Sequence, residues 1–304
     1  ILITLIISSC TSNQKDLYQN WNVYGGTKDA LHYSSLTEID TNNVDQLKIA
    51  WVYHSGDADT AVHSQIECNP IIVDSIMYAT SPRLKLLALN AATGKPKWIF
   101  DPLVSLATDS VTSSQLAAVF SNACRGATYW TDGKNDKRIF YSVGYYLICV
   151  NANTGKLVTT FGDNGRIDLH DGFGRDVKDL YITSTTPGVI YNNLLILGSR
   201  VAEDATAAPG DVRAYNVITG KQEWIFHTIP HPGEYGYDTW EDKDAWKHLG
   251  GANNWAGMSL DEKSGIVFVP TGSVSFDFYG GKRLGNNLFA DCVLALDAAT
   301  GKRI

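Results

Sequence analysis

Methionine is scarce in this sequence, basic residues do not outnumber acidic ones, and long apolar runs are missing. The 304 residues include 2 Met, and 25 Lys and Arg stand against 32 Asp and Glu. The net charge of −7 argues against nucleic acid as a partner, because phosphate binding requires a basic surface. No apolar run reaches the roughly 18 residues of a membrane-spanning helix. We therefore expect neither a nucleic-acid-binding protein nor one that crosses a membrane with helices.

Cysteine is also sparse, and its spacing is not that of a metal site. The chain has 5 Cys and no Cys-x-x-Cys pair. In an oxidising compartment one disulfide bond could join two of Cys68, Cys124, Cys149 and Cys292, but the sequence does not give its pairing. Buried free thiols are the simpler expectation.

Glycine and aromatic residues are plentiful, and they favour a turn-rich β protein. The chain has 27 Gly, 15 Tyr and 8 Trp. An alternating apolar run followed by a Thr-Gly-Lys turn occurs four times, with its glycine at Gly94, Gly155, Gly220 and Gly301. Each copy predicts a β-hairpin, because glycine tolerates positive φ in a tight turn. These glycines are 61, 65 and 81 residues apart, which predicts repeated four-stranded blades with loop insertions.

Two copies of this turn share a pattern of small and aromatic residues. An Ala stands six residues before the glycine and a Trp four residues after it, as Ala88, Gly94 and Trp98 in the first copy and Ala214, Gly220 and Trp224 in the third. An indole needs such a small residue and bare backbone to lie flat, bridging neighbouring blades. The second copy departs from the pattern with Cys149 and Thr159, and the fourth reaches the last residue, Ile304.

The turns resemble the tryptophan-docking blades of quinoprotein alcohol dehydrogenases. The stretch from Trp21 to Trp51, with its Gly25-Gly26 pair, is similar to the segment before the first blade in dehydrogenases that use pyrroloquinoline quinone (PQQ). The resemblance implies an all-β fold, a β-propeller of four-stranded blades, with residues 11–304 forming about half of an eight-bladed ring. We expect an N-terminal part of a protein of roughly 600 residues. Alone it should be inactive and poorly soluble, because an open ring exposes a sheet edge.

The same resemblance implies a cofactor site in the central channel. PQQ is a flat tricyclic quinone with three carboxylates, so its site needs cationic and hydroxyl donors and an aromatic floor. Matching positions are Glu67 in Glu-x-x-Pro, Arg125 in Cys-Arg-Gly, Thr183 and Ser184 at the start of the third blade, and Trp255 after Ala-Asn-Asn. Without the resemblance, Glu67 would be a solvated acid, Arg125 part of a surface ion pair and Trp255 a core residue.

The resemblance also implies a calcium ion. Glu203 matches the family's acidic ligand, and Ser273 stands where alcohol-oxidising relatives often place an Asn ligand. That departure favours sugars or polyols over small alcohols and leaves the second ligand open. The family's catalytic Asp lies in a motif that would follow residue 304, so we assign no catalytic base, neither Asp238 nor Asp291.

His227 and His231 offer another possible metal site. Two His four residues apart would share one face of a helix, but Pro230 and Pro232 forbid a helix here. The sequence therefore argues against a metal site at this pair, and we interpret residues 227–254 as a loop.

The first ten residues have a separate role. An apolar stretch ends in Ser8-Ser9-Cys10, which resembles a bacterial lipobox. Residues 1–10 are thus expected to be a lipoprotein signal segment, with lipidation of Cys10 and a periplasmic, membrane-tethered body whose only membrane contact is the lipid.

The activity that the resemblance to PQQ dehydrogenases implies is oxidation of a hydroxyl group of a sugar, polyol or alcohol, with electrons passing to a quinone or cytochrome c. The alternative is a non-enzymatic propeller lipoprotein, a scaffold of the outer-membrane assembly type.

Overall fold

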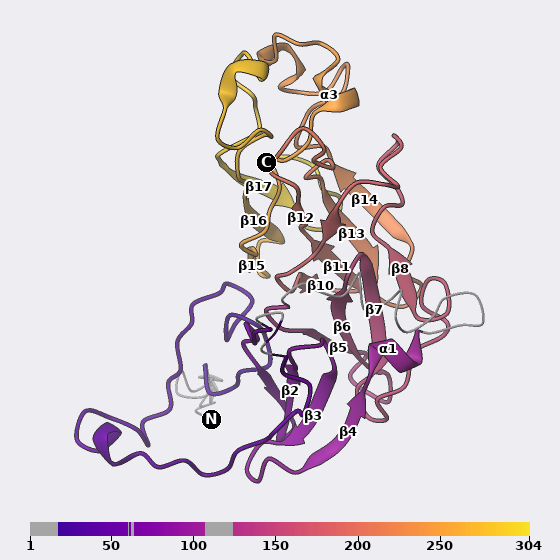
Figure 1. Ribbon diagram of the computed structural model, residues 1–304. Coiled ribbons are helices and arrows are strands. Elements are labelled where there is room, and N and C mark those ends of the chain that lie inside the picture. Colours follow the sequence, from indigo (N-terminus) through magenta and orange to yellow (C-terminus); the bar gives the residue numbers. More distant parts are fainter. Residues whose placement is uncertain (1–17, 60, 62–63, 107–123) are drawn as a thin grey trace, which may run out of the picture.

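Strands dominate the computed structural model, which describes residues 18–59, 61, 64–106 and 124–304 (Figure 1). The expected signal segment, with Cys10, lies outside the described residues. Both α-helices of the described part, α1 (Pro102–Ser105) and α3 (Ala245–His248), have four residues. This part of the chain therefore holds no helix that could cross a bilayer.

The described strands form antiparallel sheets that follow one another along the chain. Sheet one has the order β1-β2-β3-β4, at Ile71–Val73, Ile76–Thr80, Leu86–Asn90 and Pro96–Phe100. Sheet two has the order β5-β6-β7-β8, at Thr128–Thr131, Lys137–Val143, Tyr146–Asn151 and Arg166–Asp168. Sheet three has the order β10-β11-β13-β14, at Val189–Tyr191, Leu194–Leu197, Val212–Asn216 and Gln222–Phe226. Sheet four has the order β15-β16-β17, at Ser259–Asp261, Ile266–Pro270 and Val293–Asp297.

Shorter elements lie between these sheets. A two-stranded ladder pairs β9 (Ile182–Thr183) with β12 (Arg200–Val201). Three short 3-10 helices complete the described elements: η2 (Val44–Gln46), η3 (Tyr237–Thr239) and η4 (Gly280–Lys282).

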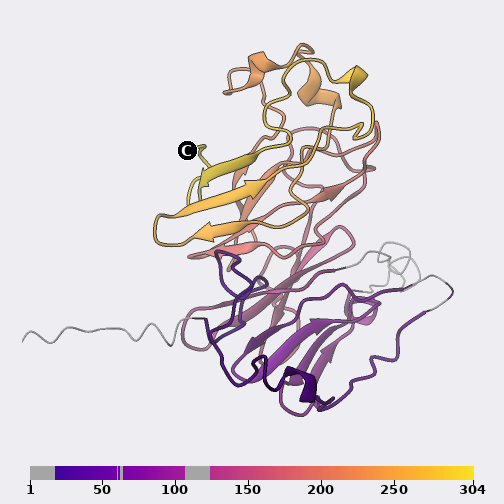
Figure 2. The ribbon, with the colours of Figure 1, turned by 90° about the vertical axis from the view of Figure 1, so that its left-hand side faces the viewer.

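Figures 1 and 2 show the four sheets side by side in chain order, from purple to yellow. We refer to them as blades 1 to 4. In each blade, strands adjacent in the sheet are consecutive along the chain, apart from the short β12 that leaves blade 3. The all-β fold is therefore confirmed. Blade 2 continues beyond the turn at Gly155, because a further turn at 161–165 leads to its outermost strand, β8.

The repeated turns are held by an Asn or Asp side chain. Oδ1 of Asn90 accepts the N–H groups of Ala92 and Thr93 at 3.1 and 3.0 Å and the Thr93 hydroxyl at 2.9 Å. Such a side chain satisfies backbone donors within the turn. The Thr N–H is bound in the same way at Asn151, Asn216 and Asp297 in the other three turns.

Tryptophans dock onto these turns from the preceding blade. Nε1 of Trp98 in β4 donates to the carbonyl of Ala152 at 3.0 Å, and its ring covers Gly155 in the blade 2 turn. A Cβ at Gly155 would lie 2.6 Å from Cδ2 of Trp98, and φ there is +70°. Trp224 covers Gly301 in the same manner. Only glycine leaves room for the indole.

A third docking tryptophan lies ahead of blade 1. Nε1 of Trp51 donates to the carbonyl of Ala91 at 3.1 Å, and its ring covers Gly94. Trp51 therefore docks on the turn of blade 1 in the same way that Trp98 docks on the turn of blade 2. Its neighbours Ile49 and Val52 are 83% and 63% exposed.

The junction of blades 2 and 3 has no such tryptophan. The N–H of Gly162 donates to the carbonyl of Thr219 at 3.0 Å, and Gly162 contacts Gly220 directly. A cavity of about 410 Å³ beside this contact is lined by Tyr146 and Tyr215, among others. In the second turn Thr159 stands where the first and third turns have a Trp, and the structure accordingly has no docked indole at Gly220.

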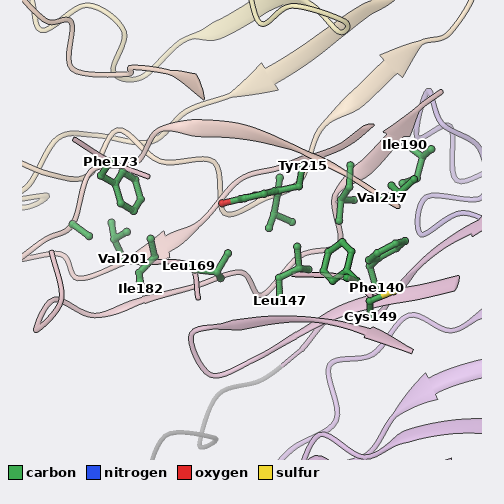
Figure 3. Close-up of a cluster of buried hydrophobic side chains, with 14 of the residues drawn as sticks. Phe140, Leu147, Cys149, Leu169, Phe173, Ile182, Ile190, Val201, Tyr215 and Val217 are labelled. Atoms are coloured by element: carbon green, nitrogen blue, oxygen red, sulfur yellow. The ribbon is translucent and has the colours of Figure 1, made fainter. Parts of the chain in front are cut away.

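Apolar side chains fill the space between adjacent blades. Figure 3 shows Phe140, Leu147 and Cys149 of blade 2 near Tyr215 and Val217 of blade 3, all of them buried. Burial of these facing side chains holds the blades together. Trp130, which the sequence could place equally in the core or near the site, belongs to this cluster.

The described cysteines carry free thiols. Cys124 and Cys149 are buried, and Cys68 and Cys292 are partly buried. This matches the expectation of free thiols for these four residues.

Candidate functional site

Arg125 lies where the first strands of three blades begin. Its N–H donates to the carbonyl of Thr185 at 2.7 Å, and its carbonyl accepts the N–H of Asn69 at 2.8 Å. Asn69 precedes β1, Arg125 precedes β5 and Thr185 precedes β10. Backbone hydrogen bonds therefore tie together the starts of blades 1, 2 and 3, and the Arg125 side chain projects from this junction.

The guanidinium of Arg125 joins residues from three other parts of the chain. Nη1 donates to the hydroxyls of Thr185 and Thr186 at 3.3 and 3.2 Å, and to the carbonyl of Trp255 at 3.3 Å. Nε lies 3.3 Å from Oε2 of Glu67, and about a third of each of these two side chains is exposed. Because a partly exposed ion pair contributes little stability, at most about 1 kcal/mol, its main effect is to orient the guanidinium.

Trp255 presents an exposed aromatic face beside this cation. Trp255 is 51% exposed, and Cζ of Arg125 lies 5.5 Å from the centroid of its ring. The hydroxyl of Thr186 donates to the Trp255 carbonyl at 2.6 Å. A Cβ at Gly272 would lie 3.8 Å from Nε1 of this ring, an ordinary van der Waals distance. A large ring held in place but half exposed is a surface on which a flat ligand can stack.

The structure does not bring Thr183 and Ser184 to Arg125. The Thr183 hydroxyl donates to the carbonyl of Gly144, and the Ser184 hydroxyl donates to the carbonyl of Thr186 at 3.2 Å. Both side chains are buried. The two residues that follow reach the guanidinium instead, because the backbone bond between Arg125 and Thr185 fixes the register.

Glu203 and Ser273, the predicted metal ligands, lie on segments that meet at Asp277. The N–H of Asp277 donates to the carbonyl of Glu203 at 3.2 Å. Burial raises the pKa of Asp277, a hydrogen bond from Ser273 lowers it, and the charge of Glu203 raises it again. Two carboxylates and a hydroxyl thus lie close together, and oxygen ligands are those that calcium prefers. Sequence reasoning missed Asp277 because it lies in an irregular loop with no motif around it.

The Ser273 loop also supports the segment that carries Trp255. The N–H of Ala252 donates to the carbonyl of Ser273 at 2.6 Å, and that of Gly272 donates to the carbonyl of Asn253 at 3.0 Å. Nδ2 of Asn253 donates to the carbonyl of Ser199, which precedes Glu203, at 2.7 Å. The acidic group and the aromatic face are therefore parts of one connected structure.

Tyr24 is a second residue that sequence reasoning did not assign to the site. Nδ2 of Asn69 donates to its carbonyl at 2.8 Å. Burial raises the pKa of the Tyr24 hydroxyl, and the charge of Arg125 opposes that shift. The opening segment of the chain therefore borders the site, which explains why a stretch ahead of blade 1 carries so much of the resemblance.

Comparison with known proteins settles the family. Residues 21–304 match the family described as PQQ: Glucose/ethanol/alcohol dehydrogenase, beta-propeller domain. The chain belongs to this family. The β-propeller fold predicted from the docking turns is thereby confirmed.

Curated relatives of this dehydrogenase domain include three bacterial quinoproteins. The chain is 32% identical to quinate/shikimate dehydrogenase (quinone) of Acinetobacter baylyi, covering 93% of this chain and 36% of the relative. It is 31% identical to quinoprotein glucose dehydrogenase A of Acinetobacter calcoaceticus, covering 94% and 37%. It is 32% identical to the dehydrogenase subunit of alcohol dehydrogenase (quinone) of Gluconobacter oxydans, covering 94% and 37%. The chain thus spans little more than a third of these relatives.

Solved structures show the same fold. The quinohemoprotein alcohol dehydrogenase ADHIIG of Pseudomonas putida superposes with a TM-score of 0.73 at 26% identity, over 95% of this chain and 40% of that one. The quinohemoprotein alcohol dehydrogenase of Comamonas testosteroni gives 0.71 at 25% identity, over 94% and 40%.

The side chains around Arg125 have the chemistry that PQQ requires. A guanidinium and the hydroxyls of Thr185 and Thr186 are hydrogen-bond donors for carboxylates. The half-exposed indole of Trp255 offers a flat face. The oxygen-bearing group of Glu203, Ser273 and Asp277 suits a hard cation. The donor set therefore fits both PQQ and calcium.

Proposed function

We propose that the full-length protein is a PQQ- and calcium-dependent oxidoreductase that oxidises a hydroxyl group of a sugar, polyol or alcohol to a carbonyl. The chain supplies one side of its cofactor site. One observation carries the proposal: Arg125 gathers Glu67, two threonine hydroxyls and Trp255 from separate blades around one exposed aromatic face. Family membership supports the same conclusion.

Each residue has a stated part in this function. Arg125, Thr185 and Thr186 bind carboxylates of the cofactor, Trp255 stacks on its ring, and Glu67 orients the guanidinium. Thr183 and Ser184 are buried. We propose that they contribute to cofactor binding only indirectly, by fixing the backbone from which Thr185 and Thr186 extend. Bound PQQ supplies the two-electron acceptor for the oxidation. We assign no residue of this chain to the carboxylate that takes the hydroxyl proton.

The calcium ion is assigned to Glu203 and Ser273, with Asp277 as a further oxygen ligand. An ion held by these residues would supply Lewis acidity and a positive charge beside the carboxylates of Glu203 and Asp277. Ser273 offers a neutral hydroxyl as a ligand, and we associate that choice with sugars or polyols as substrates in preference to small alcohols.

The cellular setting is also part of the proposal. Lipidation of Cys10 would hold the protein on a bacterial membrane with its body in the periplasm. The electron acceptor is a quinone or cytochrome c. Two relatives carry "(quinone)" in their names, which supports the first of these acceptors.

Reconstitution tests the proposal. The full-length protein, stripped of metal and cofactor, is incubated with PQQ and Ca²⁺ and assayed with a dye acceptor against glucose, glycerol, quinate and ethanol. Activity that requires both additions is the expected result. The alternative, a scaffold of the outer-membrane assembly type, has no reason to bind PQQ. Failure of PQQ to bind a folded full-length protein would leave that alternative in place.

A further inference from the structure

A second cluster of metal-binding side chains lies after blade 3, in the segment that leads towards Trp255. His227 directly follows β14, and His231 and Glu234 lie in the next turn. The N–H of Glu234 donates to the carbonyl of His231 at 3.0 Å, and Gly233 has φ of +88°. None of these three residues lies in a helix, as the sequence predicted, but the prediction of a loop throughout residues 227–254 is wrong, because η3 and α3 lie within that range. The turn nevertheless brings together the side chains that a helix would have aligned.

The three side chains are in mutual contact. The rings of His227 and His231 stack with centroids 3.7 Å apart and planes at 10°. Oε1 of Glu234 lies 2.8 Å from Nδ1 of His227, and Oε2 accepts the N–H of His231 at 2.7 Å. One ligand atom from each residue lies within 4.8 Å of the other two, and no other group of three or more His, Cys, Asp or Glu among the described residues meets that test.

The chemistry of this cluster differs from that of the Glu203 group. Two imidazoles and one carboxylate form a ligand set of the Zn²⁺ type, whereas calcium prefers oxygen ligands alone. A metal binds the neutral imidazole.

The surroundings of the cluster hold polar groups with unused bonding capacity. Oγ1 of Thr228, in a fully buried residue, and Nε1 of Trp246 have no hydrogen-bond partner. The Trp246 ring lies 4.5 Å from that of His231. Asp211, buried beside His227, accepts the N–H of Thr228 at 2.9 Å. A buried polar group without a partner in a native structure is one sign of an ion or water that the site can hold.

Charges around the cluster partly offset one another. Asp211 adds a buried carboxyl group that interacts with His227. Arg175 is the opposing positive charge: its Nη1 donates to the carbonyl of Trp246 at 3.0 Å, and it interacts with both Asp211 and His231. With Glu234 and Asp211 together, the carboxyl groups outnumber this one guanidinium, so a bound cation is not opposed by the local charge.

We propose that His227, His231 and Glu234 form a binding site for a divalent transition-metal ion of the zinc class, distinct from the calcium site at Glu203. Parallel rings cannot direct their lone pairs at one ion, because an imidazole binds a metal in its own plane. Binding therefore turns at least one ring out of the stack. The ion would then fix the segment between β14 and η3 (Tyr237–Thr239), which leads to the fourth blade.

Cobalt titration tests this site without any assay of activity. The full-length protein is stripped with chelator, Ca²⁺ is restored in excess, and Co²⁺ is added while the visible absorption of nitrogen-bound cobalt is followed. Stoichiometric binding that Zn²⁺ displaces is expected. His231→Ala and Glu234→Gln should each weaken it by at least about tenfold. Glu234 is 43% exposed, so its variant should fold normally.

His248→Ala is the matched control, because His248 makes a similar contact with Asp242 at 2.8 Å in the same connecting segment but lies outside the cluster. It should bind Co²⁺ like the parent. Absence of stoichiometric binding, or unchanged affinity in both His231→Ala and Glu234→Gln, would overturn the proposal. Neither result depends on PQQ, so the dehydrogenase proposal is tested separately.

Discussion

The guanidinium of Arg125 lies 5.5 Å from the centroid of the Trp255 indole, although the two residues introduce different blades. Its Nη1 also donates to the Trp255 carbonyl. The Arg125 side chain is therefore the positive charge of the site, and it also binds the backbone of the residue that supplies the aromatic face. Loss of its planar fork should affect ligand binding more than loss of charge alone.

Arg125→Lys tests this relationship. Lys keeps the charge, but its compact ammonium cannot reproduce the separate contacts of Nε with Glu67 and of Nη1 with Thr185 and Thr186. We expect PQQ to bind at least about tenfold more weakly, in line with the roughly 1.5–3 kcal/mol of a hydrogen bond to a charged group. Quenching of tryptophan fluorescence measures the affinity. Arg166→Lys is the control, because Arg166, on β8, lies over the ring of Tyr146, away from the site. Equal affinities in the two variants would remove Arg125 from the cofactor site.

Glu203→Gln tests the calcium assignment. Removal of one anionic ligand should weaken Ca²⁺ binding by at least about tenfold, since ligand charge sets calcium affinity. Isothermal titration of the stripped full-length protein gives the constant. Asp204→Asn is matched in charge and position, but the Asp204 carboxylate is exposed and bonded to Thr206. If both variants bind Ca²⁺ like the parent, Glu203 is not a ligand.

Gly155→Ala tests tryptophan docking. Gly155 and Gly133 have φ of +70° and +76°, so an Ala at either position carries similar backbone strain. A Cβ at Gly155 would collide with Trp98, whereas a Cβ at Gly133 would meet nothing within 4 Å. We expect Gly155→Ala to lose about 1–3 kcal/mol more unfolding free energy than Gly133→Ala, the usual cost of overpacking. Urea unfolding of the full-length protein measures both. Equal losses would show that docking contributes nothing beyond the turn.

Cys149 predicts a particular response to alkaline pH. Burial raises its pKa from 9.0 to about 12, and the charge of Arg138 only partly opposes this. Between these values the unfolded chain releases a proton that the folded protein keeps, so stability falls as pH rises. In Cys149→Ala, Tm should be lower at pH 7 but should decline less from pH 9 to 11. Cys292→Ala, at a half-buried position, is the control. Parallel Tm profiles in all three proteins would contradict the prediction.

Local patterns in the sequence predicted the blades, because the contacts that form each docking turn are made by residues close together in the sequence. Asn90 bonds residues two and three positions ahead, and Gly94 supplies the positive φ. Such contacts are visible in a short window of sequence. The docking of Trp51 on Gly94 was not, because its partner turn lies after three strands of blade 1 rather than beside it.

The residue types of the candidate site follow from the resemblance, whereas the register of the threonines does not. Arg125, Glu67 and Trp255 meet as the resemblance implied. Thr185 and Thr186, rather than the two residues before them, reach Arg125 because a long-range backbone bond sets their position. The pairing of His227 with His231 was discounted for lack of a helix, although a turn can also bring two side chains together.

The position of Trp51 has a practical consequence for anyone who shortens this chain. Cutting immediately before β1 would look harmless, since it removes no strand. It would also strip the indole from Gly94, along with Tyr24 from the rim of the site. Truncation libraries and domain fusions should therefore treat residues 18–59 as structural, and place affinity tags or fusion partners ahead of them.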